Sequence, residues 1–373
     1  MERTVKHEIH RYIENHKEEL ISLIAKLCTI ISPTGFEKAK AEYILHWLHN
    51  AGAGEAYCDE AGNVLFLLSG QTSGKLPLYC AHIDTVFGDI ENICPRIEAN
   101  KMYAPSCGDN CANAAGLMFI IKMFLELSIR PPSDILFAFD VGEEGLGNLK
   151  GIRHIMSQWH SRINEVIAVD GGSDAFVNRA VGSKRYRVEI ETQGGHSWSD
   201  FGKDNAIVLA SCIINQIYQY TPSSEAKTTY NIGTISGGTS VNTIAGSAEF
   251  LLDLRSESAE CLEALDKSIL EIIRGIKKRD GSKIKLTLLG IRPCGEDTPK
   301  TELEKRLLIL RAAEGLETSF HCSSTDANIP LSMGIPAVSF GMRRGGKAHS
   351  IHEYIELDSL VEGMRQFVSF MLS

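Results

Sequence analysis

Apolar and polar positions along this chain follow two patterns, and the first is a set of short, continuous apolar runs. Four of these runs end in Gly or Asp, and they occupy residues 63–70, 76–84, 134–142 and 165–172. Apolar runs of this length without alternation are typical of strands buried on both faces of an α/β sheet. Helical periodicity at 113–129 and 148–160 separates several of the runs, which predicts a sheet covered by helices.

Helical spacing also dominates the two ends of the chain. Amphipathic periodicity predicts helices over 5–28 and 36–51, with the breaking segment SPTGFE (32–37) between them. After Pro299 the α/β pattern returns, and the expected elements are helices near 302–314 and 357–372 and a strand at 337–341.

The second pattern begins after Gly182, where apolar and polar residues alternate. YRVEIETQ (186–193) alternates as a strand with one solvated face does. The following predicted elements are a helix at 205–219, strands at 228–238 and 247–256, a helix at 258–277 and a strand at 283–291. The resulting order, β-α-β-β-α-β, is that of a ferredoxin-like unit. We therefore predict a mixed-sheet α/β catalytic domain (1–182 and 297–373), interrupted by an inserted ferredoxin-like α+β domain (183–296).

Composition narrows the class of protein and its partners. The 373 residues suffice for about two domains. A net charge of -9 without a basic run argues against nucleic acid or a membrane surface as partner. The first residues contain no apolar h-region, and no apolar run approaches the ~18 residues that span a bilayer. Ten cysteines without a C-x-x-C pair indicate reduced thiols and a cytoplasmic location.

Ionisable residues cluster where the predicted buried strands end. His82 and Asp84 close YCAHIDTVFG, Glu143 and Glu144 follow the strand at 134–142, and Asp170 lies in AVDGG. In open α/β sheets the carboxyl ends of the strands form the ligand crevice.

Two further segments add candidates of the same kind. Asp109 lies in SCGDNCANAAG, and His349 lies in GGKAHSIHEY. Taken singly, each candidate is more often a turn residue or a hydrogen-bonded core residue than a metal ligand. A buried carboxylate without a partner costs several kcal/mol, however, so the whole set favours a metal site. Two imidazoles and at least four carboxylates are enough for two divalent ions that share a bridging ligand.

At this point the chain resembles a known family of co-catalytic metallopeptidases and amidohydrolases. That family includes peptidase T, glutamate carboxypeptidase, acetylornithine deacetylase and succinyl-diaminopimelate desuccinylase. The resemblance extends over nearly the whole chain through AHIDTV, GDNCANAAGL, GEEGLG, VDGG, GGHSWSDFGKDNAI, GGTSVNTIAGSAEFLLDLRS, SSTDAN and AHSIHEY. Where many relatives continue from the bridging aspartate with other residues, this chain has DNCANAAG.

The resemblance implies a role for each residue of the first metal site. His82 would bind the first metal, and Asp84 would orient the His82 ring through its other nitrogen. Asp109 would bridge the two metals, and Asp170 would complete the first site.

The resemblance also implies the second site and the base. Glu144 and His349 would complete the second metal site, and Glu143 would act as general base without binding a metal. His352 competes with His349, but the family pattern places the ligand four residues before a glutamate, and Glu353 marks His349.

In the inserted domain the resemblance implies three substrate-binding residues. His196 would reach the active site of a partner subunit and polarise the scissile carbonyl, and Asn242 and Arg255 would hold the oxyanion or carboxylate of the substrate. The alternative for His196 is a surface loop residue, and for Arg255 it is a salt bridge at a strand end.

The predicted function is hydrolysis of an amide bond in a small peptide, as in a peptidase T-like aminopeptidase or dipeptidase. The resemblance implies attack by a hydroxide between two divalent cations, with Zn as the family metal, although these ligands also suit Mn or Co. One alternative is a deacylase of N-acyl amino acids, and another is a non-catalytic binding protein of the same fold. The exposed edge of a ferredoxin-like sheet predicts a homodimer through the inserted domain.

Overall fold

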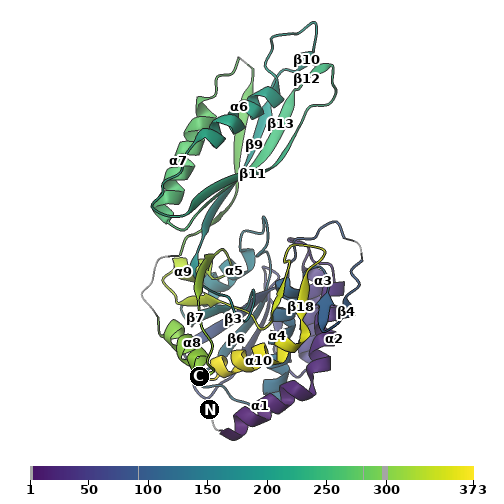
Figure 1. The fold of residues 1–373 in the computed structure, drawn as a ribbon, viewed down its shortest axis with the longest axis vertical. Helices are drawn as coiled ribbons and strands as arrows, with labels where there is room; N and C mark the ends of the chain where they lie inside the picture. Colours follow the sequence, from purple (N-terminus) through teal and green to yellow (C-terminus); the bar gives the residue numbers. More distant parts are fainter. Residues whose placement is uncertain (1–2, 91, 280, 296–300) are drawn as a thin grey trace. The chain divides into compact units, whose positions relative to one another are not determined.

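The computed structural model describes residues 3–90, 92–279, 281–295 and 301–373. The chain divides into two compact units, shown in Figure 1. Unit 1 comprises Met1–Ala180 and Glu296–Ser373, and unit 2 comprises Val181–Gly295.

Unit 1 is built around one mixed sheet with the strand order β1-β2-β6-β3-β7-β16-β8-β15. Its strands are β1 (Tyr57–Cys58), β2 (Val64–Leu68), β3 (Leu76–His82), β6 (Ile135–Asp140), β7 (Ile163–Ala168), β8 (Phe176–Ala180), β15 (Phe320–Ser323) and β16 (Ala337–Ser339). The central strand β3 pairs in parallel with β6 and β7, and all of its residues are buried. The α/β fold class with a mixed sheet is confirmed.

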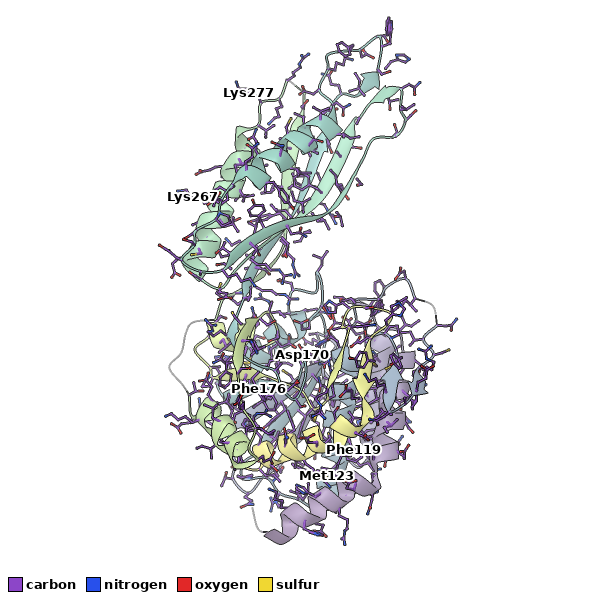
Figure 2. All side chains as sticks on the ribbon, in the orientation of Figure 1. Phe119, Met123, Asp170, Phe176, Lys267 and Lys277 are labelled. Carbon is purple, nitrogen blue, oxygen red and sulfur yellow. The ribbon has the colours of Figure 1, made fainter. Side chains whose placement is uncertain are left out.

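Helices cover both faces of this sheet. They are α1 (Arg3–Asn15), α2 (Lys17–Thr29), α3 (Lys38–Asn50), α4 (Asn113–Glu126), α5 (Lys150–Trp159), α8 (Glu302–Ala313), α9 (Asn328–Ser332) and α10 (Leu357–Met371). The larger apolar core joins one sheet face to α1–α4 and α10, and includes Phe119 and Met123, which Figure 2 labels. A smaller core joins the opposite face to α5 and α9.

The prediction of one helix over 5–28 is wrong, because two helices, α1 and α2, occupy that range. His16 separates α1 from α2 with φ −113° and ψ 18°, outside helical values. Its ring stacks on Tyr12 at 4.0 Å between centroids, and its Nδ1 lies 2.9 Å from the Tyr12 carbonyl oxygen. The His16 N–H still donates to the Tyr12 carbonyl oxygen at 3.1 Å, so the break is confined to the backbone angles of His16 and the amphipathic pattern runs through it.

A small antiparallel sheet of unit 1 has no counterpart among the predicted elements. It contains β4 (Arg96–Glu98), β5 (Lys101–Tyr103), β17 (Gly345–Gly346) and β18 (Tyr354–Glu356). Pairing of β18 with β5 brings the segment after His349 beside the irregular turn η1 (Cys107–Ala112), which carries Asp109. This pairing links two stretches of chain that lie far apart in the sequence.

Unit 2 has the element order β-α-β-β-α-β. The elements are β9 (Gly182–Glu191), α6 (Ala206–Gln219), β11 (Thr228–Gly237), β13 (Ser247–Ser256), α7 (Ala259–Gly275) and β14 (Lys283–Arg292). The strands form one antiparallel sheet in the order β11-β13-β9-β14, and one apolar core joins it to both helices. Two short strands, β10 (Gly195–His196) and β12 (Thr243–Ile244), pair with each other.

Within the described residues, no helix combines the length and the apolar character that crossing a bilayer requires. All ten cysteines are free thiols, and five of them are buried.

Candidate metal centre

Neighbouring strands deliver the candidate ligands to one edge of the central sheet. His82 is the last residue of β3, Glu143 and Glu144 follow β6, and Asp170 follows β7. Because β6, β3 and β7 are parallel neighbours, these residues share the carboxyl edge of the sheet. Figure 2 labels Asp170 at this edge.

Asp109 lies between two histidines. The Nε2 atom of His82 is 3.1 Å from Oδ1 of Asp109, and the Nε2 atom of His349 is 3.1 Å from Oδ2 of Asp109. Each histidine also has its own carboxylate: Asp170 Oδ1 is 3.9 Å from His82 Nε2, and Glu144 Oε1 is 3.0 Å from His349 Nε2. The two oxygens of Asp109 therefore face two separate groups of ligands.

These two groups fit a pair of divalent cations. In each group, His82–Asp109–Asp170 and Asp109–Glu144–His349, the candidate ligand atoms lie within 4.8 Å of one another. Ligand atoms bound tetrahedrally at about 2.0–2.1 Å from one ion would lie about 3.3 Å apart. The observed nitrogen–oxygen separations of 3.0 to 3.9 Å are compatible with this value.

The pKa values of these groups show a site that attracts positive charge. Burial would lower the pKa of His82, but Asp109, Asp84 and Asp170 outweigh burial and raise it well above its usual value. Asp109 and then Glu144 raise the pKa of His349 to about 10. Burial, followed by the charge of Asp109, raises the pKa of Asp170. Bound cations would supply the positive charge that the cluster otherwise takes up as protons.

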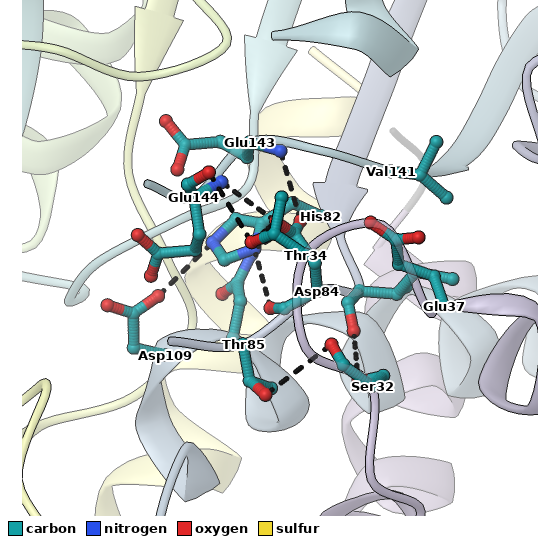
Figure 3. Close-up of polar contacts among 12 residues, drawn as sticks. Ser32, Thr34, Glu37, His82, Asp84, Thr85, Asp109, Val141, Glu143 and Glu144 are labelled. Atoms are coloured by element: carbon teal, nitrogen blue, oxygen red, sulfur yellow. Dashed lines mark hydrogen bonds and ion pairs between the residues drawn. The ribbon is translucent and has the colours of Figure 1, made fainter. Parts of the chain in front are cut away.

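Asp84 lies just past β3, because the strand ends at His82. The Nδ1 atom of His82 is 3.2 Å from the backbone oxygen of Asp84 and 3.6 Å from its Oδ1. The closer partner of the ring is therefore the carbonyl group rather than the carboxylate that the sequence suggests. The Asp84 carboxylate instead accepts hydrogen bonds from the Glu143 and Glu144 N–H groups, at 3.0 and 2.9 Å (Figure 3). Asp84 thus ties the end of β3 to the loop that carries both glutamates.

Glu143 lies beside the two groups of ligands and is 6% exposed. Gly142, with φ +72°, turns the chain out of β6 immediately before it, a conformation that glycine adopts without strain. Glu143, His82 and Glu144 each place a candidate ligand atom within 4.8 Å of the others. The carboxylate of Glu143 therefore reaches the same region as the proposed ligands.

The two histidines of the C-terminal motif, His349 and His352, have different surroundings. His349 contacts both Asp109 and Glu144, although its side chain is 56% exposed. His352 is exposed, and its backbone N–H donates to Ser350 Oγ at 3.1 Å. This geometry supports the choice of His349 as the metal ligand.

In unit 2, two of the three candidate substrate-binding residues lie together. His196 pairs with Thr243 across β10 and β12, and the Ser197 N–H donates to the Asn242 carbonyl oxygen at 3.0 Å. The Nδ1 atom of His196 accepts the Trp198 N–H at 3.2 Å, so the neutral ring carries its proton on Nε2. His196 and Asn242 are both exposed.

Arg255 lies apart from that pair, at the other end of β13. Its Nε donates to Asp253 Oδ2 at 2.6 Å, and its side chain is 42% exposed. The salt bridge that the sequence leaves open as an alternative is therefore present.

Two features of this region were not predicted from the sequence. Cys80, Asp140 and Asp326 form a further buried group, in which the carboxyl groups of Asp140 and Asp326 interact with each other. The second feature is Glu353, which the sequence motif predicts only as a marker of His349. Its side chain is 1% exposed and faces the loop of Asp109. In the sequence, the buried group is indicated only by Asp140 at the end of the apolar run ILFAFD and by Asp326 in SSTDAN.

Similarity to known proteins extends over most of the chain. The model of "Peptidase family M20/M25/M40" matches residues 78–373. N-acetyldiaminopimelate deacetylase from Bacillus velezensis is 25% identical over 276 residues, covering 70% of this chain and 72% of that protein. A Pyrococcus furiosus protein named as a LysW-lysine/LysW-ornithine hydrolase is 34% identical over 138 residues. That match covers 37% of this chain and 38% of the relative.

Solved structures share the fold at low sequence identity. The dipeptidase Dug1p from Saccharomyces cerevisiae has a TM-score of 0.80 and 14% identity, with 98% of both chains covered. Because the family model matches most of the chain, this protein belongs to peptidase family M20/M25/M40 and is a hydrolase of that family.

Proposed function

We propose that this protein hydrolyses an amide bond in a small peptide and that it uses two divalent cations. The observation that carries this proposal is the position of Asp109. Its two oxygens lie 3.1 Å from two different histidines, and each histidine has its own further carboxylate. Such an arrangement suits a pair of cations that share one carboxylate.

The chain's own residues account for the proton transfers. When bound, the two cations would supply the Lewis acidity that makes water a nucleophile near neutral pH. Glu143 accepts the proton of the attacking water and then donates it to the leaving amine nitrogen. Asp84 holds Glu143 in place through its backbone N–H.

Residues of unit 2 are proposed to hold the substrate. His196 presents an Nε2–H group, which can donate to a carbonyl oxygen as negative charge develops there. Asn242 lies directly before β12, and its carbonyl oxygen accepts the Ser197 N–H. Arg255 would bind a substrate carboxylate with the donors that Asp253 does not occupy.

A second candidate function is removal of the acyl group from an N-acyl amino acid. The N-acetyldiaminopimelate deacetylase match, at 25% identity over 70% of this chain, favours it. The two reactions differ in the acyl part of the scissile amide. In an aminopeptidase it is an amino acid with a free α-amino group, and in a deacylase it is an acyl group such as acetyl.

The test is a screen of dipeptides and tripeptides against the same amino acids carrying an N-acetyl group. The protein is first made metal-free and then reloaded with Zn, Mn or Co, and the released amine is measured. We expect turnover of peptides with free N-termini. Turnover of the N-acetyl series alone would favour the deacylase, and no turnover in either series by metal-loaded protein would favour a binding protein.

We also propose Zn as the native metal, since imidazole and carboxylate ligands suit it, and the same reloading series compares it with Mn and Co. A cytoplasmic location is proposed as well, supported by ten free cysteines, because such thiols persist in reducing compartments.

A further inference from the structure

Glu353 is a buried carboxylate directly before β18. It is 1% exposed and lies four residues after His349. A buried carboxylate is stable only when hydrogen-bond donors or charges compensate its loss of hydration. The hydrogen-bond donors around Glu353 therefore show which part of the chain its carboxylate holds in place.

The Glu353 carboxylate accepts hydrogen bonds from three backbone N–H groups of the loop that carries Asp109. Glu353 Oε2 accepts the Ser106 N–H at 2.8 Å, and Oε1 accepts the N–H groups of Gly108 and Asp109 at 3.0 and 2.8 Å. One of these donors is the backbone N–H of Asp109 itself. The carboxylate thus fixes the backbone from which the Asp109 side chain extends.

The loop is shaped to accept this carboxylate. A Cβ atom on Gly108 would lie 2.7 Å from Glu353 Oε1 and 2.8 Å from Arg343 Cζ, closer than such atoms approach in folded proteins. Ser106 has φ +59°, a left-handed conformation that turns its N–H toward the same carboxylate. Glycine at 108 therefore allows the loop to approach Glu353.

The segment that carries Glu353 also carries a proposed ligand of the second cation. The Glu353 N–H donates to the Ser350 carbonyl oxygen at 3.0 Å, and the Glu353 carbonyl oxygen accepts the Ala104 N–H at 3.2 Å. The turn from His349 to Glu353 is therefore attached to the Asp109 loop through both backbone and side chain.

We propose that Glu353 is a positioning residue that aims the two oxygens of Asp109 at two cations and couples this ligand to His349. This inference rests on the proposed role of Asp109 as a shared ligand. Residues that orient metal ligands typically change metal affinity or activity by about 10–100-fold when they are replaced.

The experiment measures binding of Zn²⁺ alone to the metal-free, full-length protein by competition with a chelator. Glu353→Ala is expected to weaken binding by about 10–100-fold. Glu353→Gln should have a smaller effect, because its amide oxygen can still accept the Gly108 and Asp109 N–H groups while the Ser106 N–H loses its acceptor. Glu356→Gln is the matched control, because Glu356 lies in the same segment but is 37% exposed and pairs with Lys101 and Arg344.

A spectroscopic readout separates positioning from a general loss of stability. With Mn²⁺ bound, the wild-type protein should give the electron paramagnetic resonance spectrum of a spin-coupled pair, and this coupling should diminish in both Glu353 variants. The inference is overturned if the variants keep wild-type affinity and coupling, or if they only melt at lower temperature while the folded fraction binds Zn²⁺ normally.

Asp109→Asn distinguishes failure of this inference from failure of the proposed function. If Asp109→Asn binds both cations as the wild type does, the shared-ligand role is wrong and the inference falls with it. If Asp109→Asn loses a cation while Glu353→Ala and Glu353→Gln bind normally, only the role of Glu353 is wrong.

Discussion

At the scale of single residues, the two adjacent glutamates after β6 have different surroundings. Glu144 Oε1 lies 3.0 Å from His349 Nε2, whereas Glu143 is proposed to take a proton from the water that attacks the substrate. Both backbone N–H groups are held by Asp84, so neither residue is placed by its side chain alone. Such fixed backbones let two identical side chains take different roles.

The first prediction concerns the base. Glu143→Gln keeps the size of the side chain but removes the proton acceptor, so turnover should fall by about 10²–10⁴-fold while two metals remain bound. Steady-state kinetics and metal analysis on the same sample measure both effects. Near-normal turnover would exclude Glu143 as the base, and loss of a metal would mean that the roles of Glu143 and Glu144 are exchanged.

The second prediction concerns the histidine of the second site. His349→Ala should release one metal and leave the other bound by His82, Asp109 and Asp170, because His349 contacts Asp109 and Glu144. His352→Ala is the matched control and should keep both metals. Metal content after dialysis provides the measurement, and the opposite result for the two variants would identify His352 as the ligand.

At the scale of elements, two buried acids join β6 to the segment before α9. Asp140 ends β6, Asp326 lies two residues before α9, and both are fully or almost fully buried. Burial raises the pKa of Asp140 to about 7 and raises that of Asp326 well above its usual value. Two acids in this position are compatible with folding when they retain a proton.

The third prediction follows from that proton. Between the unfolded pKa of about 3.9 and the folded value of about 7, the folded state holds a proton that the unfolded state has lost. The free energy of unfolding should therefore decrease as pH rises through this window, by an amount on the order of a few kcal/mol.

Asp140→Asn should flatten this dependence, because the amide does not titrate. Urea unfolding of the metal-free protein at about pH 5 and about pH 7.5 measures it. Asp358→Asn is the control, since Asp358 is 72% exposed and pairs with Lys17 at the surface. Equal pH dependence in wild type and Asp140→Asn would show that Asp140 keeps an ordinary pKa.

At the scale of the whole molecule, the residues proposed to bind the cations and those proposed to bind the substrate belong to different units. The proposed ligands all belong to unit 1, while His196 and Asn242 belong to unit 2. Strand β11 is an edge of the unit 2 sheet and is largely exposed, with Ile235 58% exposed. Exposed edge strands pair readily with a copy of themselves, which supports a homodimer through unit 2.

The fourth prediction is that His196 acts on the site of its partner. Mixing Glu143→Gln with His196→Ala, under conditions of subunit exchange, should restore activity, because each mixed dimer then has one site with neither defect. Mixing Glu143→Gln with His349→Ala is the control and should restore none, since both defects lie in unit 1. Failure of the first mixture despite demonstrated exchange, or a monomer at micromolar concentration, would rule out action in trans.

The sequence alone determined the features that depend on local chemistry. Apolar runs such as 63–70 and 134–142 predicted buried strands, because burial on both faces removes alternation. The alternation in 186–193 predicted the one-faced strand β9 in the same way. The proposed metal ligands could also be predicted from the sequence, since only a few residue types, such as His, Asp and Glu, bind metals.

Only the tertiary structure decided features that arise from contacts between distant segments. Strands β8 and β15 pair with each other across more than a hundred residues, and neither has a strong pattern of its own. The roles of Asp140, Asp326 and Glu353 likewise depend on neighbours brought together by folding. The sequence does not distinguish a solvated Asp or Glu from a buried one. Only folding determines which hydrogen-bond donors and charges surround the carboxylate.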